Sequence, residues 1–473
     1  MLKLHATLLP ILLCLLCLST VGAFGEAPYF ASGIKVGEVD QDSAIVWVRL
    51  TQEKSAKFKR LPIFTEGLAD KAKDSGKMPI DVVSGIKGEA RVTYWNKFNQ
   101  SKKLKTDWIT VTEKGDFTHQ FGLKNLTANW QYEFVVEARK AGDKAATTTM
   151  SGAFKTAPTR DQAVPVRFVV TTCQAVRSID SGAEGHVAYK QMLEFNPDFF
   201  VHTGDILYYD KAPLCKNEAQ ARAKWNLMFA YGHNQKFHRH VSSYFMKDDH
   251  DTLKNDSWPG QTYGDLTFNQ GLAIFREQVP MGEKTYRTIR WGKDVQIWMT
   301  ENRDFRSSNR VKDGPMKTIL GKEQKEWLMK TMAESDATYK FLITPGPIVG
   351  PDKKGKSDNH ANKAFDHEGQ ALRDFIGKQK NTYVICGDRH WQYCSKDPKT
   401  GVIEMGCGPI NDQHKYGGNP GEDAKYHRFF SKKGGFLGIS IGNGKAKAEW
   451  FTTSDIDPST GKPKVRYTET LGR

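Results

Sequence analysis

The sequence VRFVVTTCQ at residues 166–174 indicates the fold class, because a short apolar strand of the buried type ends abruptly in polar residues. PDFFVHTGD at 197–205 repeats this pattern. The same region contains further predicted elements, namely strands at 341–344 and 382–386 and helices at 219–231 and 322–335. Strands that alternate with helices are typical of an α/β layer structure, in which ligands gather at the carboxyl ends of strands. Strand-like runs at 435–453 favour a mixed sheet sandwich over a purely parallel one.

The part of the chain before residue 158 has a different, β-rich pattern. Alternating polar and apolar residues predict strands with one buried face at 43–50, 90–95, 108–112 and 131–139. LKNLTANWQY at 123–132 resembles the tyrosine corner of fibronectin type III and immunoglobulin-like sandwiches. Residues 52–87 are rich in Lys, Asp and Gly and are interpreted as a solvated insertion. Trp47 and Trp95 fit a sugar-binding platform, but strand tryptophans more commonly belong to a sandwich core.

The N-terminus predicts a secretory signal peptide. Lys3 precedes an apolar run at 8–18, and the small residues at 21–23 offer a cleavage site. No other stretch has the length needed to cross a bilayer, so we expect a secreted protein, periplasmic or extracellular, without a membrane span. Five cysteines follow the signal, and in an oxidising compartment this odd number leaves at least one thiol unpaired or bound to metal. The spacing of the last three allows one disulfide among Cys386, Cys394 and Cys407, or with Cys215.

The composition excludes several protein classes. The 473 residues are 38% hydrophobic and 26% charged, which excludes wholesale disorder, collagen and a multi-span membrane protein. The formal net charge of +15 favours anionic partners such as phosphate esters, polyanionic glycans, nucleic acid or membrane headgroups. Basic residues are dispersed, as at 236–240 and 353–356, without a groove-reading motif. We therefore expect no stable nucleic-acid partner, and the sequence does not indicate an oligomeric state.

Polar side chains follow four successive strand ends and carry the predicted chemistry. They are Cys173, Asp205 with Tyr208, DDHD at 248–251, and GDRH at 387–390. A carboxylate between two cations needs one oxygen for each, a role that Asp205 fits. Thiolate and phenolate ligands favour a trivalent ion such as iron. Two bridged cations polarise a phosphoryl oxygen and activate a water for attack on phosphorus. His250, between Asp249 and Asp251, is the candidate proton donor to the leaving alkoxide.

This ordered set of motifs resembles the alkaline phosphatase D (PhoD-type) family of calcineurin-like metallophosphoesterases. NRDFR at 302–306 and LGKEQKEWL at 320–328 are similar to further segments of that family, and the resemblance covers nearly all of the mature chain. It implies an α/β four-layer metallophosphoesterase sandwich, with mixed β-sheets flanked by helices, preceded by an all-β fibronectin/Ig-like sandwich. The expected divisions are a signal peptide at 1–23, the β-sandwich at 27–157, the catalytic domain at 164–455 and a C-terminal tail at 456–473.

The resemblance also implies roles for individual residues. Ferric iron is expected at Cys173, Asp205, Tyr208 and His390. One or two calcium ions are expected at a second site made by Asp205, Asp249 and Asp388, with Asn255 as a further ligand. Zinc or another divalent ion is the alternative. His250 and Asp205 are the expected catalytic residues. Arg303 is expected either to contact phosphate or to form an internal salt bridge, and His360 to contact substrate, to add a ligand or to be an ordinary loop residue.

The chain departs from the family pattern at several places, among them Asp251, which replaces a Glu, Glu301, which replaces an Asp, and the run TLK at 252–254, where the family is acidic and rich in Asn. None of the core ligands is missing. We therefore expect a secreted alkaline phosphatase or phosphodiesterase that hydrolyses small anionic phosphate mono- and/or diesters by metal-activated water or hydroxide. The alternative is a non-catalytic or weakly active extracellular protein that binds polyanions on a phosphatase scaffold.

Overall fold

The structure is a computed structural model that describes residues 28–472 except 57, 59–82, 354 and 416–424. The predicted signal peptide at 1–23 and most of the predicted insertion at 52–87 lie outside the described residues.

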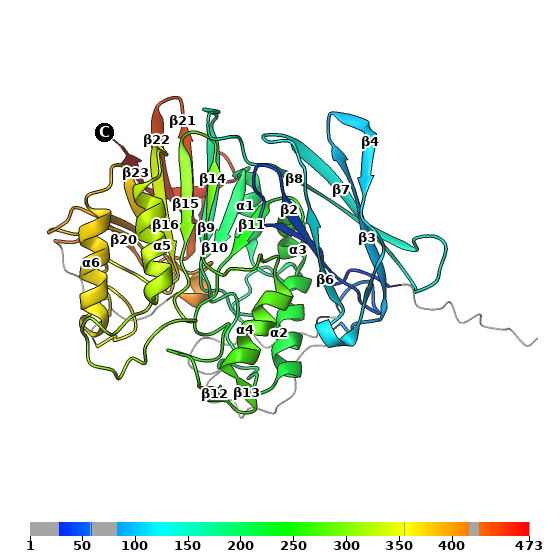
Figure 1. The fold of residues 1–473 in the computed structure, drawn as a ribbon, viewed down its shortest axis with the longest axis horizontal. Coiled ribbons are helices and arrows are strands. Elements are labelled where there is room, and N and C mark those ends of the chain that lie inside the picture. The colour runs from blue at the N-terminus through cyan, green and yellow to red at the C-terminus, as the bar shows by residue number, and fades with distance from the viewer. Residues whose placement is uncertain (1–27, 57, 59–82, 354, 416–424, 473) are drawn as a thin grey trace, which may run out of the picture.

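Two β-sheets packed face to face form the centre of the molecule (Figure 1). The first has nine strands in the order β23 (Pro463–Leu471), β22 (Lys445–Ile456), β21 (Gly435–Gly442), β9 (Val166–Thr171), β10 (Phe199–His202), β11 (Ser242–Phe245), β1 (Lys35–Gly37), β2 (Ala44–Arg49) and β6 (Thr118–Leu123). The second has seven, in the order β14 (Arg287–Trp291), β15 (Val295–Met299), β16 (Tyr339–Thr344), β17 (Thr382–Cys386), β19 (Ile403–Gly406), β18 (Gln392–Lys396) and β20 (His427–Ser431).

Helices cover the outer faces of both sheets and complete a four-layer sandwich. Side chains of α1 (Val187–Glu194) and α3 (Gly232–His238) pack on the nine-stranded sheet. Those of α5 (Lys322–Ala333) and α6 (Asp366–Ile376) pack on the seven-stranded sheet. Two further helices, α2 (Glu218–Ala230) and α4 (Phe268–Gln278), pack against each other and against the loops that follow β9, β10 and β11. A small hairpin of β12 (Thr262–Tyr263) and β13 (Leu266–Thr267) precedes α4.

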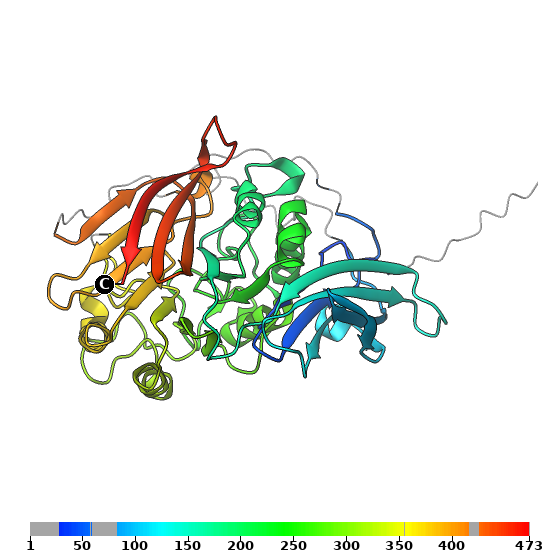
Figure 2. The same cartoon turned by 90° about the horizontal axis from the view of Figure 1, so that it is seen from above.

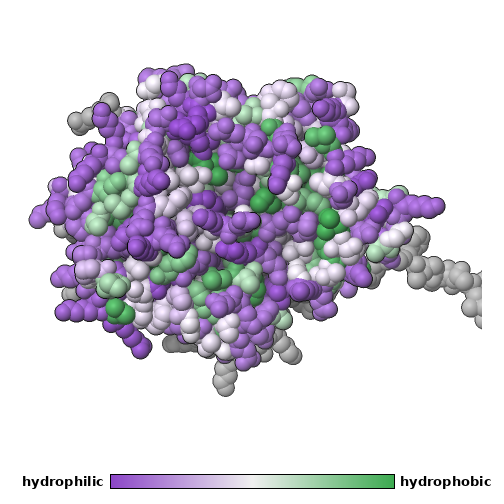
Figure 3. All heavy atoms as spheres, in the orientation of Figure 1, coloured by the Kyte–Doolittle hydropathy of each residue, from purple (hydrophilic) through white to green (hydrophobic). Residues whose placement is uncertain are grey.

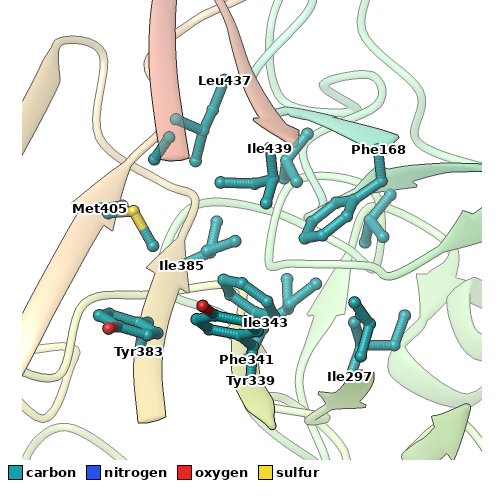
Figure 4. Packing of buried hydrophobic residues seen from close by; sticks show 14 of the residues in the cluster. Phe168, Ile297, Tyr339, Phe341, Ile343, Tyr383, Ile385, Met405, Leu437 and Ile439 are labelled. Atoms are coloured by element: carbon teal, nitrogen blue, oxygen red, sulfur yellow. The ribbon is translucent and has the colours of Figure 1, made fainter. Parts of the chain in front are cut away.

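The central strands are apolar along their whole length because both of their faces are buried. In β9, Phe168 and Val170 point between the two sheets, whereas Val169 packs under α1. In β16, Phe341 and Ile343 likewise lie in the core between the sheets (Figure 4), and Leu342 packs under α5 and α6. Alternate side chains of a strand point to opposite faces, so a strand covered on both sides needs apolar residues at every position.

The N-terminal β-sandwich lies at one end of these layers, as Figure 2 shows from above. Its second sheet contains β4 (Asn99–Lys105), β3 (Gly88–Asn96), β7 (Gln131–Arg139) and β8 (Thr148–Lys155), with β5 (Ile109–Val111) paired to β3. The Tyr132 hydroxyl oxygen accepts a hydrogen bond from the Thr127 backbone N–H at 2.9 Å, so the tyrosine corner is present. Trp47 is fully buried, and its Nε1 donates to the Glu277 carbonyl at 2.7 Å, which excludes a sugar-binding role for its ring.

Two divisions of the chain differ from the sequence expectation. Strands β1, β2 and β6 of the N-terminal sandwich continue the catalytic sheet, because β1 pairs in parallel with β11 at Gly37 and Ser243. Pairing in this way satisfies backbone groups that an edge strand would leave open. Residues 456–473, expected as a tail, instead contain β23, which pairs along β22 at the other edge of the sheet. Most of the side chains of β23 are exposed or half-buried, so its sequence carries little hydrophobic signal.

The surface agrees with the polar composition. The face shown in Figure 3 is mainly hydrophilic, with small and separate hydrophobic patches. In the part of the chain that the structure describes, none of the helices combines the length and the apolar character that crossing a bilayer requires.

A buried polar network joins the N-terminal sandwich to α2 and α4. The Asp116 carboxylate accepts two hydrogen bonds from the Arg49 guanidinium, at 3.0 and 3.1 Å. It also accepts from Asn226 Nδ2 of α2 at 3.0 Å and from Gln278 Nε2 of α4 at 2.9 Å. Asp116 and Arg49 are both buried, so each charge relies on the other for compensation.

We predict that Asp116→Asn destabilises the whole protein by about 3–5 kcal/mol, since it leaves the Arg49 charge buried without its counter-ion. Asn is nearly isosteric with Asp and tolerates the left-handed backbone at residue 116, where φ is 48°. Urea unfolding of the purified chain gives the free energy of unfolding. Asp107→Asn, on an exposed residue of the same sandwich, is the matched control. Equal effects of the two substitutions would contradict the prediction.

Candidate metal centre

The site lies where the carboxyl ends of strands from both sheets meet. Strands β9, β10 and β11 are parallel neighbours, so the residues that follow them come together at one edge of the nine-stranded sheet. Cys173, Asp205 and the segment 248–251 occupy these positions. Asp388 follows β17 of the other sheet, and its backbone N–H lies 3.4 Å from the Thr172 hydroxyl oxygen.

Three of these strand ends share an unusual backbone conformation. Cys173, Asp205 and Asp388 have φ values of 50°, 54° and 58°, in the left-handed region. For a residue other than glycine this costs about 1–2 kcal/mol, and such strain is typical of functional sites. Gly204 precedes Asp205 at φ 104°, and a Cβ there would lie 2.7 Å from the Asp248 backbone nitrogen. Glycine is therefore required for the loop that follows β10 and the loop that follows β11 to approach each other.

Donor atoms at the site form three overlapping groups centred on Asp205. Within each group, the donor atoms lie within 4.8 Å of one another. The groups are Cys173, Asp205 and His390; Asp205, Asp249 and His250; and Asp205, Asp248 and Asp388. The Tyr208 hydroxyl adds a fourth donor beside the first group, because it donates to Asp205 Oδ2 at 3.0 Å and lies 3.3 Å from His390 Nε2.

Several carboxylate oxygens of the site are buried without a hydrogen-bond donor. Asp205 Oδ1, Asp248 Oδ2 and Asp249 Oδ1 have no hydrogen-bond partner among the described residues. A buried charged oxygen in this condition carries a large desolvation cost. Cations supply what these atoms lack, since carboxylate oxygens suit hard ions, and thiolate and imidazole suit transition metals. The donor set therefore fits a metal centre.

Burial changes the protonation of the donors. It raises the pKa of Asp205 to about 7, despite the positive charge of His250 nearby. It also raises the pKa of the Cys173 thiol and of the Tyr208 phenol well above their usual values, and the Asp205 charge adds to both effects. Both groups therefore keep their protons unless a cation is bound, because a coordinating cation deprotonates thiols and phenols.

Asp210, which the sequence analysis missed, positions His250. His250 Nδ1 lies 2.6 Å from Asp210 Oδ1, and Asp210 Oδ2 accepts from the Asn255 backbone N–H at 2.8 Å. Burial alone would lower the pKa of His250, but the charges of Asp249, Asp210 and Asp205 raise it to about 10. Asp210 thus fixes a proton on Nδ1 and leaves Nε2 to exchange protons. The sequence signal that could have identified Asp210 is its position, two residues after the candidate ligand Tyr208.

Arg303 forms an internal salt bridge, one of the two roles considered for it. It is buried, its Nε donates to Asp248 Oδ1 at 2.5 Å, and its Nη2 lies 3.7 Å from Asp249 Oδ1. Asp251 has a related structural role. Its carboxylate accepts from the backbone N–H of Ile206 at 3.0 Å and of Asp248 at 2.7 Å. These two bonds connect the loop that follows β10 to the loop that follows β11.

His360 is outside the donor groups, and Asn255 is at the surface. Asn255 is exposed, because Leu253 is buried against α2 and α4 and the chain then turns outward. His360 is buried, and its Nε2 lies 3.0 Å from Glu368 Oε2 of α6, a contact that holds the loop to the helix. The structure thus places Asn255 at the surface, and places His360, as a residue of its loop, in the support for α6.

His414 is a second residue that sequence reasoning missed. It is buried, and its Nε2 lies 2.8 Å from the Tyr208 hydroxyl oxygen. Burial lowers the pKa of His414 to about 3, so its ring is neutral. It lies in a short 3-10 helix and not at a strand end, which is why the pattern of strand ends gave no signal for it.

Cys386, Cys394 and Cys407 are buried free thiols, contrary to the expected disulfide. Cys394 and Cys407 point into the core between the sheets, whereas Cys386 packs with Trp391 and Tyr393. The Cys386 sulfur lies 3.0 Å from the Tyr393 hydroxyl oxygen. Closeness in sequence therefore does not bring these sulfur atoms into bonding positions.

Comparisons with known proteins agree with this architecture. A family model described as PhoD-like phosphatase matches residues 168–434. The solved structure of PhoD is similar over 94% of this chain and 90% of its own, with a TM-score of 0.72 and 17% identity. Purple acid phosphatase PPD1 from seeds of yellow lupin (Lupinus luteus) is similar over 95% and 75%, with a TM-score of 0.64 and 14% identity. No curated protein matched. The metallophosphoesterase-like fold class is confirmed.

We predict that Asp205→Asn removes more bound metal than Cys173→Ala, because Asp205 belongs to all three donor groups and Cys173 to one. The metal-free chain is dialysed against ferric and calcium ions and its content is measured by elemental analysis. Cys173→Ala should lose mainly iron, and Asp205→Asn both ions. Asp107→Asn, on the surface, is the control. Wild-type metal content in Asp205→Asn would show that the donor groups do not hold cations.

Proposed function

The chain belongs to the PhoD-like phosphatase family, and on that premise we propose that it is a metal-dependent phosphohydrolase acting on small anionic phosphate esters. The observation that carries the proposal is the position of Asp205, a buried residue that belongs to all three groups of donor atoms. A carboxylate so placed can bridge cations, and bridged cations are the means by which many phosphoesterases work.

The donors divide into two chemically different sets. Cys173, Tyr208 and His390 offer sulfur, phenol oxygen and imidazole nitrogen, which together suit ferric iron. Asp249 and Asp388 offer oxygen, which suits calcium, and Asp248 adds one more oxygen beside Asp388. We propose ferric iron in the first set and one or two calcium ions in the second, with Asp205 shared between them. Zinc or another divalent ion remains the alternative occupant.

The residues around the donors complete the catalytic machinery. When bound, the cations would polarise a phosphoryl oxygen and lower the pKa of a water molecule, which supplies the nucleophile. Asp210 holds the His250 ring through Nδ1 at 2.6 Å, so that Nε2 can give a proton to the leaving alkoxide. Arg303 keeps Asp248 and Asp249 in place. The net charge of +15 attracts anionic esters over longer distances.

Secretion is part of the proposal and rests on the sequence of residues 1–23. A periplasmic or extracellular location would give the enzyme access to phosphate esters outside the cytoplasm. N-terminal sequencing of the protein recovered from outside the cells tests this point, since cleavage after residue 23 is expected.

We predict hydrolysis of a chromogenic phosphate monoester or bis-ester that is abolished by a chelator and restored by metal. His250→Ala should lower kcat roughly 10²–10⁴-fold, the usual contribution of a general acid. Asp210→Asn should give a smaller loss and a shifted pH profile, because it changes the proton on Nδ1 without removing the ring. Asp107→Asn should match the wild type.

The competing possibility, a scaffold that binds polyanions without catalysis, predicts a different result. Slow turnover that is equal with and without chelator, and unchanged in His250→Ala, would favour the scaffold and contradict the proposal. Comparison of the two esters also shows whether the enzyme prefers monoesters or diesters.

A further inference from the structure

His414 makes a direct contact with one of the proposed iron ligands. It is the last residue of the short 3-10 helix η5 (Asp412–His414), and its Nε2 lies 2.8 Å from the Tyr208 hydroxyl oxygen. Its ring centroid lies 4.9 Å from that of Tyr208 and 4.5 Å from that of His390. The contact therefore belongs to the same buried cluster as the metal donors.

The loop that carries His414 is fixed to the metal-site side of the nine-stranded sheet. The Ile410 backbone N–H donates to the Cys173 carbonyl at 3.4 Å, next to the proposed thiolate ligand. Asn411 Nδ2 donates to the Ser178 carbonyl at 2.5 Å and to Asp180 Oδ2 at 3.1 Å. Asp412 Oδ1 accepts from the Gly434 backbone N–H at 2.7 Å. Since three successive residues are anchored, the His414 ring is held in place by the fold.

His414 is not itself a member of the donor groups. In the described residues, the group formed by Cys173, Asp205 and His390 has all its donor atoms within 4.8 Å, and His414 is not part of it. Its one polar contact toward the centre is with Tyr208. It therefore lies behind the phenol oxygen, in the position of a partner to a ligand.

The direction of the hydrogen bond follows from the proton count at Tyr208. The phenol proton is directed toward Asp205 Oδ2, 3.0 Å away, and the oxygen of an ionised carboxylate only accepts. The phenol oxygen is then an acceptor toward His414 Nε2. When Tyr208 binds a metal as phenolate it has no proton at all, so an Nε2–H donor is the arrangement that the contact then requires.

We propose that His414 is a positioning residue that donates Nε2–H to the Tyr208 phenolate and so reduces the negative charge which the phenolate places on ferric iron. The inference rests on the proposed function, because it requires Tyr208 to be a metal ligand. Partners of this kind orient metal ligands and tune the metal, and their loss typically costs roughly 10–100-fold in metal affinity or activity.

The electronic consequence has a definite sign. A hydrogen bond to the phenolate oxygen stabilises the electrons that the phenolate donates to iron, so the phenolate-to-iron charge-transfer band moves to higher energy. Removal of the donor should move the band to longer wavelength. It should also make the ferric ion harder to reduce, because the unbonded phenolate donates more strongly.

The experiment uses the full chain, freed of metal and titrated with ferric ion alone. His414→Phe keeps an aromatic ring without a donor, and His414→Gln retains an amide N–H. Tyr208→Phe identifies the phenolate band by its absence. His367→Phe, on an exposed histidine of α6, controls for a change of histidine to phenylalanine elsewhere.

We expect the band of His414→Phe at longer wavelength than that of the wild type, together with ferric affinity lowered roughly 10–100-fold. His414→Gln should lie nearer the wild type and His367→Phe should equal it. A band at the wild-type position in His414→Phe would overturn the inference, and so would a shift of the same size in His414→Gln and His414→Phe.

A second experiment, with zinc in place of ferric ion, distinguishes failure of this inference from failure of the proposed function. If ferric ion gives no band but hydrolysis is sensitive to chelator, the zinc-loaded chain is compared with Tyr208→Phe for the ultraviolet absorbance of a tyrosinate. Absence of that signal would overturn the inference and leave the proposed function standing. A wild-type chain that neither binds metal nor hydrolyses esters would contradict the proposed function itself.

Discussion

The repulsion among the buried and half-buried carboxylates at the ends of β10, β11 and β17 is the constraint on which the site depends. Asp205, Asp248 and Asp388 place oxygens within 4.8 Å of one another, and Asp249 is equally close to Asp205. Two like charges at 4 Å repel by about 4 kcal/mol at an effective dielectric constant near 20. Arg303 compensates part of this charge through Asp248 and Asp249, and Arg389 forms an ion pair with Asp388. Burial, with the charges of Asp249 and Asp248, raises the pKa of Asp205 to about 7 although His250 opposes the change, and cations would supply the missing compensation.

The surrounding fold holds these charges together by rigid connections on every side. Lys247 follows β11 and is buried, and its Nζ forms ion pairs with Glu301 at 2.8 Å and Asp304 at 2.6 Å, after β15 of the other sheet. Asp251 links the loops that follow β10 and β11. Strands covered on both faces can tolerate the left-handed turns at Cys173, Asp205 and Asp388, because the packing of the strands outweighs a few kcal/mol of backbone strain.

Much of this arrangement was predictable from the sequence, and the misses have a common physical cause. Apolar strands that end in Cys173 and Asp205 are recognisable because parallel strands bring their carboxyl ends to one edge. Asp210 and His414 act through other side chains, and a contact between residues 206 positions apart, such as His414 with Tyr208, leaves no local pattern. The exposure of Asn255 gave no sequence signal, because it depends on how Leu253 packs. The disulfide expectation failed because sequence distance does not report which side of a strand each sulfur faces.

The N-terminal sandwich is also part of the support for the site. Strand β1 pairs directly with β11, the strand that leads into the segment carrying Asp248, Asp249 and His250. Asp116 reaches from the sandwich to α2 and α4, the helices that pack beneath the same loops. The sandwich therefore extends the sheet and braces α2 and α4, which pack against the loops of the site. The two parts of the chain therefore form one framework. Asp205 follows a strand of the sheet that the sandwich extends, and Asp388 follows a strand of the sheet that faces it. The position of one relative to the other depends on both sheets.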